Sequence, residues 1–125
     1  MPSGSSSQRR RTSRAALGAI LSSIAGIQEV VTGKTLTQYS QDWLTRHAVE
    51  RGMEIISEAT RRLPAALLKQ HPEINWKQIM GMGNVLRHDY DDIVDEVIFD
   101  AAVKRLPALK AAILAIEANL DEPEE

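Results

Sequence analysis

Residues 75–90 read Asn-Trp-Lys-Gln-Ile-Met-Gly-Met-Gly-Asn-Val-Leu-Arg-His-Asp-Tyr, and this stretch carries the clearest helix signals of the chain. The stretch begins with the pattern of a helix N-terminus. Asn75 can cap the helix, and Gln78 occupies the capping-box position. Ile74 and Ile79 can form the hydrophobic staple that fixes how the chain enters the helix. These signals predict a helix that starts at Asn75 in a defined register.

That register sorts the side chains of the helix onto two faces. The core-facing stripe consists of Ile79, Met82, Leu86 and Tyr90. Gly81, Asn84 and His88 fall on a different face. We therefore expect Asn84 and His88, which are four residues apart, to lie one turn from each other and to face solvent or a partner.

The side chains best suited to chemistry gather at the end of this helix. Arg87 and Tyr90 flank the pair of Asn84 and His88. An imidazole exchanges a proton near pH 7, a guanidinium holds a phosphate with two parallel donors, and a phenol can accept a transferred group. The combination indicates phosphate chemistry, with Asn84, Arg87 and His88 as candidate catalytic residues. The alternative is a surface or capping histidine, which is the commoner role for a lone His near a helix end.

Three acidic residues, Asp89, Asp91 and Asp92, surround Tyr90. Their spacing is not that of a known metal site, and an Asp pair between two helices more simply caps the second helix. No serine lies in a strand-turn-helix elbow of the kind that activates a nucleophile. The sequence therefore predicts neither a metal nor a cofactor.

The remaining pattern predicts an all-α antiparallel bundle of four or five helices. The first helix carries an apolar stripe and stops near Gly33. This stripe consists of Leu17, Ile20, Leu21, Ile24, Ile27 and Val31. Residues 34–41 have no clean period, so we expect a loop there, with Tyr39 packed against the core.

A long helix is predicted from about Gln41 to Leu63. Its inward face consists of Ala48, Gly52, Ile55, Ile56, Ala59 and Leu63. Its polar face consists of Arg46, Glu50, Glu54, Ser57 and Arg61. The small residues Ala48 and Gly52 are one turn apart and permit the close approach of another helix.

Arg51 and Glu58 lie at the edges of the inward face, two turns apart. Two interpretations stay open for them. They can support a functional site, or they can be structural, with Glu58 paired to Arg61 or Arg62.

Prolines divide the second half of the chain. Pro64 ends the long helix or starts a short one over residues 65–70. Asp91 or Asp92 can cap a further helix, which Pro107 kinks or restarts. The apolar stripe of this last part consists of Val94, Val97, Ile98, Ala101, Leu109, Ile113, Ile116 and Leu120.

The 125 residues, 43% of them hydrophobic, suit one domain, which we place at 13–120. Residues 1–12 are rich in serine and then in arginine; we expect a disordered tail, with an RNA-contacting arm as the alternative. The acidic residues 121–125 are expected to be disordered as well.

Composition also narrows the function. The absence of cysteine excludes disulfides, thiolate catalysis and thiolate metal sites. No apolar run approaches the roughly 20 residues that span a bilayer, so we expect a cytoplasmic protein without a membrane segment. The net charge of −2, from 15 basic and 17 acidic residues, requires any RNA contact to be local.

The segment Gly-Met-Gly-Asn-Val-Leu-Arg-His-Asp-Tyr at 81–90 resembles the signature of the HepT-like family, a branch of the HEPN superfamily of small helical proteins. The resemblance extends over residues 15–118 and includes the segments 48–59, 62–64 and 71–76. The family motif is Arg, four residues, His, one residue, Tyr. His88 and Tyr90 match it, but Gly83 stands where the motif has arginine. The chain is similar to a subgroup with the pattern Gly-Asn-x-Leu-Arg-His-x-Tyr.

The resemblance implies a metal-independent ribonuclease toxin that works as a homodimer, with the histidine helices of two subunits facing one another. In that scheme His88 acts as general acid or base on the RNA 2′-hydroxyl, and Asn84 positions the phosphate or the imidazole. We expect Arg87 to replace the missing motif arginine, because helix side chains lean toward the N-terminus and Arg87 follows Gly83 by one turn.

The resemblance also implies a partner, an MntA-like minimal nucleotidyltransferase that silences the toxin by transferring AMP from ATP to Tyr90. An added AMP would bring bulk and negative charge beside the cleft. The alternative function is a catalytically weak dimer that serves as partner or substrate of the nucleotidyltransferase, and Gly83 is the residue that divides the two hypotheses.

Overall fold

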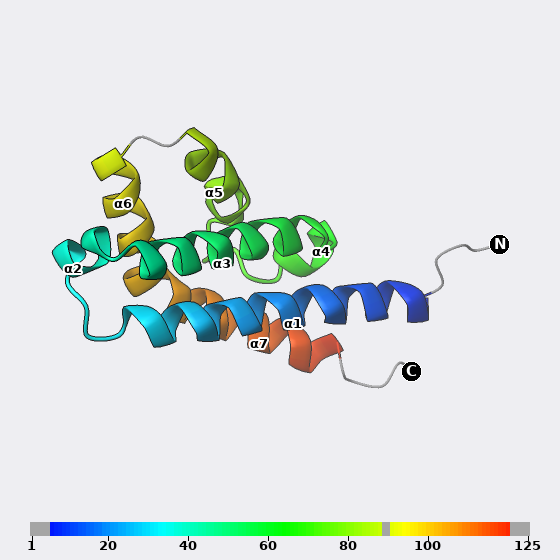
Figure 1. Cartoon of the computed structure of the whole chain (residues 1–125). Coiled ribbons are helices and arrows are strands. Elements are labelled where there is room, and N and C mark those ends of the chain that lie inside the picture. Colours follow the sequence, from blue (N-terminus) through cyan, green and yellow to red (C-terminus); the bar gives the residue numbers. More distant parts are fainter. Residues whose placement is uncertain (1–5, 89–90, 121–125) are drawn as a thin grey trace.

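The computed structural model describes the backbone of residues 6–88 and 91–120, and the side chains of residues 7–86 and 95–120. The described part is helical, as predicted (Figure 1). Its elements are α1 (Ser6–Val31), α2 (Leu36–Gln41), α3 (Trp43–Arg61), α4 (Ala65–Leu68), α5 (Trp76–His88), α6 (Asp91–Asp100), the π-helical segment η1 (Ala101–Arg105) and α7 (Leu106–Leu120).

Helix α3 lies at the centre of the arrangement. It packs extensively against α1 on one side and against α5 on another, and α1 in turn packs against α7 (Figure 1). Helices α1 and α3 run antiparallel, so the N-terminus of α1 lies at the end of the bundle where α3 finishes. The predicted antiparallel helical bundle is therefore confirmed.

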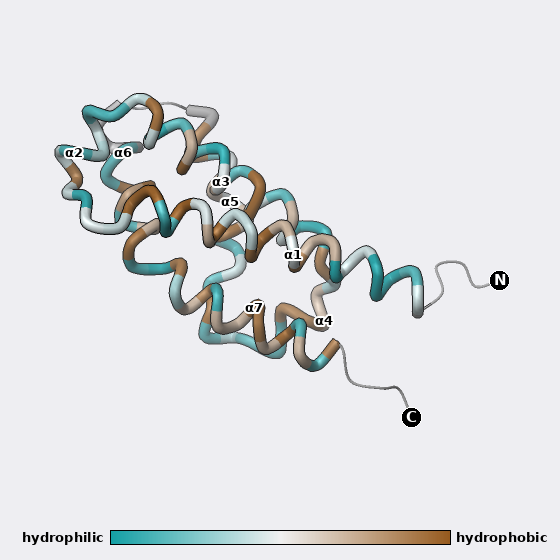
Figure 2. The backbone as a smooth tube through the Cα atoms, turned by 60° about the horizontal axis from the view of Figure 1, so that its bottom comes forward, coloured by the Kyte–Doolittle hydropathy of each residue, from teal (hydrophilic) through white to brown (hydrophobic). Residues whose placement is uncertain are grey.

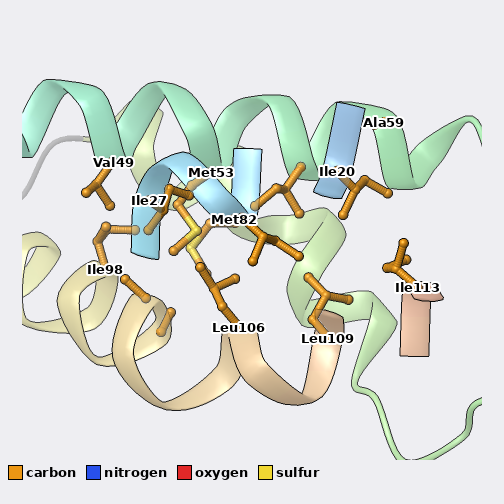
Figure 3. Close-up of a cluster of buried hydrophobic side chains, with 14 of the residues drawn as sticks. Ile20, Ile27, Val49, Met53, Ala59, Met82, Ile98, Leu106, Leu109 and Ile113 are labelled. Carbon is orange, nitrogen blue, oxygen red and sulfur yellow. The ribbon is translucent and has the colours of Figure 1, made fainter. Parts of the chain in front are cut away.

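The core lies between these helices, and apolar segments of the chain face it (Figure 2). Met82 of α5 is 6% exposed and reaches the same cluster as Met53 of α3 and Leu106 of α7 (Figure 3). The predicted stripe of α1 is buried, with Leu21 partly so; its buried members are Leu17, Ile20, Ile24, Ile27 and Val31. The core thus joins segments from both halves of the sequence.

Two predictions for the first 41 residues were wrong. Helix α1 begins at Ser6, inside the stretch expected to be a disordered tail, because Gln8, the arginines and the alanines that follow favour helix. Residues 36–41 are helical rather than a loop. There Thr35 and Gln38 form a reciprocal capping box, with hydrogen bonds of 3.1 and 2.9 Å.

Two other expectations for this region are confirmed. Gly33 ends α1 with a positive φ of 79°, which glycine adopts without strain. Tyr39 is fully buried, and its ring centroid lies 5.2 Å from that of Phe99. The capping box of α2 therefore delivers an aromatic side chain to the core.

Helix α3 starts one residue after Asp42, whose carboxylate accepts hydrogen bonds from the backbone N–H and the hydroxyl of Thr45. Gly52 is at a close approach as predicted, since a Cβ built there would lie 2.7 Å from Cδ1 of Ile27. Ala48 was predicted on the inward face but is exposed, and Val49 is buried instead. The buried face is centred one residue later than the sequence suggested at this end of the helix.

The chain breaks elsewhere follow the predictions. Pro64 caps the short helix α4, and the side chain of Asn75 accepts a hydrogen bond of 3.1 Å from the backbone N–H of Gln78 at the start of α5. The proline ring of Pro107 has no N–H for the carbonyl four residues earlier. The wide turn of η1 precedes it, so this proline lies where the helix α6 changes into α7.

Helix α1 differs from one further expectation. Within the described residues, Ser7–Val31 is long and apolar enough to cross a membrane by length and composition, because alanine, glycine and serine fill the positions between its apolar residues. Core helices and signal sequences share that property. In this fold the apolar stripe of α1 packs against α3 and α7, as in a core helix.

Candidate functional site

Helix α5 carries the predicted catalytic residues. It spans both Asn84 and His88, so the helix places these two positions one turn apart. The side chain of Asn84 is exposed, as the sequence predicted, and it has an interaction partner within the chain. The side chains of Arg87 and His88 and the whole of Tyr90 lie outside the described residues, so their predicted roles stay predictions.

A polar groove lies between α3 and α5, at the residue that precedes Asn84. Its volume is about 230 Å³. It is lined by Arg51, Glu54, Ser57, Glu58, Arg61 and Gly83. Gly83 is buried and lines the groove from α5, whereas five side chains line it from α3. The groove therefore sits at the position where the motif of the resembled family has arginine.

Two hydrogen bonds fix the register of α3 against α5 at this groove. The hydroxyl of Ser57 donates to the backbone carbonyl of Met80 at 2.7 Å, and Nη2 of Arg61 donates to the same carbonyl at 2.6 Å. Ser57 is 3% exposed, although the sequence placed it on the polar face of its helix. The bond to Met80 explains how α3 buries this hydroxyl without losing a hydrogen bond.

The structure brings Arg51 and Glu58 together at the groove. Within the described side chains, Glu58 has no ion pair with Arg61 or Arg62, which was the structural alternative. Arg51 lies 3.8 Å from Glu54 in an ion pair whose arginine side chain is 73% exposed. Solvent screens such a pair, so it holds Arg51 only weakly. Both residues therefore line the groove, and their role in supporting a site stays a prediction.

The groove combines two guanidinium groups with two carboxylates, which makes it polar but close to neutral. Each guanidinium carries five donors in a fixed fork, and the bond of Arg61 to Met80 uses part of that set. The remaining donors suit an anionic oxygen, such as that of a phosphate. Among the described side chains of residues 7–86 and 95–120, no group of three or more His, Cys, Asp or Glu could hold a metal ion.

Sequence reasoning missed Glu54, Ser57 and Arg61 as residues of this groove. A signal for Glu54 and Arg61 exists. Arg51, Glu54, Glu58 and Arg61 recur at intervals of three and four residues, which places all four along one side of α3. A charged row of this kind is usually a solvated face, and only the packing of Gly83 against it turns the row into a groove wall.

A second cavity, of about 320 Å³, lies on the other side of α5, between this helix and the α6–η1 segment. Met82 and Val97 provide apolar walls, and Glu96, Asp100 and Arg105 provide charge. Arg105 donates a hydrogen bond to the side chain of Gln78 across this space. The residues that line this second cavity include none of the predicted catalytic or supporting residues, so the groove at Gly83 remains the candidate site.

Comparison with known proteins gives a family match over most of the chain. Residues 20–116 match the family described as "Ribonuclease HepT-like". No solved structure matches significantly.

Named relatives carry ribonuclease descriptions. "Putative RNase TTE0752" of Caldanaerobacter subterraneus subsp. tengcongensis is 30% identical over 85% of this chain and 95% of its own length. "Putative RNase MJ0127" of Methanocaldococcus jannaschii is 31% identical over 75% of this chain and 78% of its own. "Probable ribonuclease HepT" of Thermococcus cleftensis is 30% identical over 81% of this chain and 92% of its own.

Proposed function

This chain belongs to the HepT-like ribonuclease family, and from that premise we propose that it cleaves RNA with the residues at the end of α5. The observation that carries the proposal is the groove at Gly83. It supplies two arginines and a buried glycine between one and two turns before His88, next to the exposed Asn84. In this proposal the groove holds a phosphate within reach of the residues at the end of α5.

The proposed reaction needs no metal. His88 takes the proton of a ribose 2′-hydroxyl, whose oxygen attacks the adjacent phosphorus, and the bond to the 5′-oxygen breaks. The products are a 2′,3′-cyclic phosphate and a 5′-hydroxyl, which receives a proton. Asn84 positions the phosphate or the imidazole, and Arg87 grips the phosphate in place of the motif arginine that Gly83 lacks.

We propose that the active form is a homodimer whose α5 helices face each other. An open space lies over the Cβ position of Gly81: apart from its chain neighbours and the backbone of its own helix, no atom of the described residues comes within 4 Å of it. Asn84, on the same helix, is exposed. A second copy of the helix could therefore approach closely here and provide the other wall of the cleft. Light scattering that finds only monomer at micromolar concentration would contradict this proposal.

The proposed biological role is the toxin of a toxin-antitoxin pair in the cytoplasm, where its RNA substrate and ATP are available. The antitoxin is an MntA-like nucleotidyltransferase that transfers AMP to Tyr90. Tyr90 follows His88 by two residues, so a bound AMP would place negative charge beside the phosphate site and repel RNA. The second candidate function is a catalytically weak dimer that is only a partner or substrate of this transferase. Gly83, in place of the motif arginine, favours it.

Cleavage of a single-stranded RNA in the presence of a chelator tests the proposal. We expect wild-type protein to produce cyclic phosphate ends and His88→Ala to lower the rate by about 10²–10⁴-fold, the usual contribution of a general acid or base. His47→Ala is the matched control, because His47 is exposed and stacks on Trp43 at the start of α3. Equal rates for wild type and His88→Ala would refute the role of His88. A wild type without activity would favour the second candidate function.

A further inference from the structure

The amino-terminal end of α1 is a basic arm. Four arginines, Arg9, Arg10, Arg11 and Arg14, lie within six residues, and the first acidic residue of the chain is Glu29. Figure 2 shows this end of α1 as hydrophilic and extending beyond the rest of the bundle. Residues 1–28 carry +4; because the whole chain carries −2, the other 97 residues carry −6. The amino-terminal end is thus positively charged, whereas the rest of the protein carries a net negative charge.

Arginine has a good helix propensity, but the charge of these arginines does not stabilise the helix. The N-terminus of a helix carries a partial positive charge, so acidic residues stabilise it and basic residues oppose it. The first turn of α1 contains no acidic residue. Arg10 and Arg14 are four residues apart, a spacing at which like charges repel, although both have interaction partners within the chain. The positive charge of the arm therefore lowers the stability of the helix that carries it.

The arginines are presented to solvent on more than one side. Arg9, Arg11 and Arg14 are exposed. Successive residues turn by about 100° around a helix, so Arg9 and Arg11 project in nearly opposite directions. The first buried residue of α1 is Ser13, which means that the turns before it extend past the core. An extended polyanion could contact this arm from any side.

The arm lies toward the end of α3 that carries Arg61 and Arg62 (Figure 1). Because α1 and α3 are antiparallel neighbours, the arm lies at the end of the bundle where α3 finishes, near α4 (Figure 1). Arg61 and Arg62 are exposed at that end, and Arg61 also lines the groove at Gly83. The arm and the α3 end of the groove therefore both carry exposed arginines.

We propose that this arm, defined by Arg9, Arg10, Arg11 and Arg14, binds the phosphodiester backbone of RNA outside the cleaved bond. The inference rests on the proposed ribonuclease function. It adds a binding site for the part of the RNA that lies away from the cleaved bond. Contacts to phosphates carry no sequence information, so the arm raises affinity for single-stranded RNA of any sequence. It also makes that affinity strongly dependent on salt, because each neutralised phosphate releases counterions.

The test measures how RNA affinity changes with salt in the His88→Ala background, which keeps the substrate intact. Fluorescence anisotropy with a labelled single-stranded RNA compares this protein with one that also carries Arg9→Gln and Arg11→Gln. Glutamine keeps a good helix propensity while it removes the charge. The control carries Lys77→Gln and Lys110→Gln, two exposed lysines on α5 and α7 whose loss changes the net charge equally.

We expect the slope of log affinity against log salt to become shallower by about 0.7 for each lost phosphate contact, or about 1.4 for the arm variant. The control should keep the original slope. An unchanged slope in the arm variant, or an equal change in the control, overturns the proposal. Cleavage by wild type is measured separately: if the wild type cuts RNA while the arm variant keeps its slope, the arm proposal fails and the proposed function stands.

Discussion

Ser57 and Met80, 23 residues apart in the chain, are joined by a hydrogen bond of 2.7 Å from the Ser57 hydroxyl to the Met80 carbonyl. This bond holds α3 against α5 at the wall of the groove. We expect Ser57→Ala to lower the free energy of unfolding by about 1 kcal/mol, the net contribution of a typical buried hydrogen bond, and to lower RNA cleavage as well. Urea unfolding and the cleavage assay measure the two effects.

Ser22→Ala is the control for this prediction. Ser22 is exposed on α1, where alanine is the better helix former, so this change should not lower stability. If Ser57→Ala unfolds like wild type, the bond to Met80 does not hold the two helices in register.

Arg87 should be essential for cleavage if it replaces the motif arginine. Lysine keeps the charge but loses the two parallel donors, so both Arg87→Ala and Arg87→Lys should cut RNA more slowly than wild type. The alternative is a surface pair of Arg87 with Asp91, four residues on, which stabilises by only about 0.3–0.5 kcal/mol. Lys77→Ala, at the exposed start of α5, is the control. Full activity of Arg87→Ala would leave the phosphate contact to Arg51, Asn84 or the partner subunit.

Tyr90 should gain AMP when the protein is co-expressed with a cognate nucleotidyltransferase. The phenol oxygen attacks the α-phosphorus of ATP and pyrophosphate leaves, so intact-mass spectrometry should detect one or more added AMP groups. Tyr90→Phe removes the accepting oxygen and should abolish the mass shift, whereas Tyr39→Phe, at the other tyrosine of the chain, should keep it because Tyr39 is fully buried. A mass shift that persists in Tyr90→Phe would assign the modification to another residue.

Gly52 should not tolerate a larger side chain. A Cβ at this position would lie 2.7 Å from both Cγ1 and Cδ1 of Ile27, so Gly52→Ala should overpack the contact of α1 with α3. Overpacking costs about 1–3 kcal/mol, which exceeds the gain of about 0.5–1 kcal/mol from alanine in a helix.

Gly26 provides the matched comparison, since no described atom beyond its chain neighbours and its own helix backbone lies within 4 Å of its Cβ position. Gly26→Ala should raise the free energy of unfolding by about 0.5–1 kcal/mol. Thermal and urea unfolding of both variants check the pair. Stabilisation by both substitutions would mean that the two helices are farther apart at Gly52 than the structure indicates.

Asp42 should make stability depend on pH in the acidic range. The hydroxyl of Thr45, and then its backbone N–H, donate hydrogen bonds that hold the pKa of Asp42 below its ordinary value of 3.8. A lowered pKa in the folded state stabilises the protein above pH 3.8, and this stabilisation is lost as pH falls through the lowered pKa. The substitution Asp42→Asn keeps a side-chain oxygen for the cap but removes the titrating group.

The measurement is the free energy of unfolding of wild type and Asp42→Asn at several pH values. The advantage of wild type should be largest near neutral pH and should shrink between about pH 5 and pH 2. A constant difference over that range would show that the charge of Asp42 does not stabilise α3.

Much of the architecture follows from short-range patterns. The cap at Asn75, the stop at Gly33 and the break at Pro64 depend on residues within about one helical turn, so the sequence predicts them well. The end of the first helix was predicted correctly, but its start was not. The serine-rich, basic stretch before residue 13 has the composition of a disordered tail, and only the helix propensity of its arginines indicates a helix.

The face of a helix is less certain near its edges. Ala48 and Ser57 were each placed on the wrong side of α3, because an apolar stripe defines the centre of a buried face and leaves its margins to the neighbouring helices. The same uncertainty leaves two roles open for Arg51 and Glu58 in the sequence, and the packing of α5 beside them favours the site.

The helical class, the helix that carries Asn84 and His88, and the family can all be read from the sequence, because periodicity and motif are properties of residues close together in the chain. That α3 lines the groove at Gly83 follows from the packing alone. In the sequence, Gly83 stands where the family motif has arginine, which suggests only that a phosphate-binding side chain is missing. The sequence does not indicate that other residues form a groove around this glycine. Packing of α5 on α3 brings Arg51 and Arg61 to that glycine from sequence positions well over two helical turns away, a separation over which local patterns carry no information about contact.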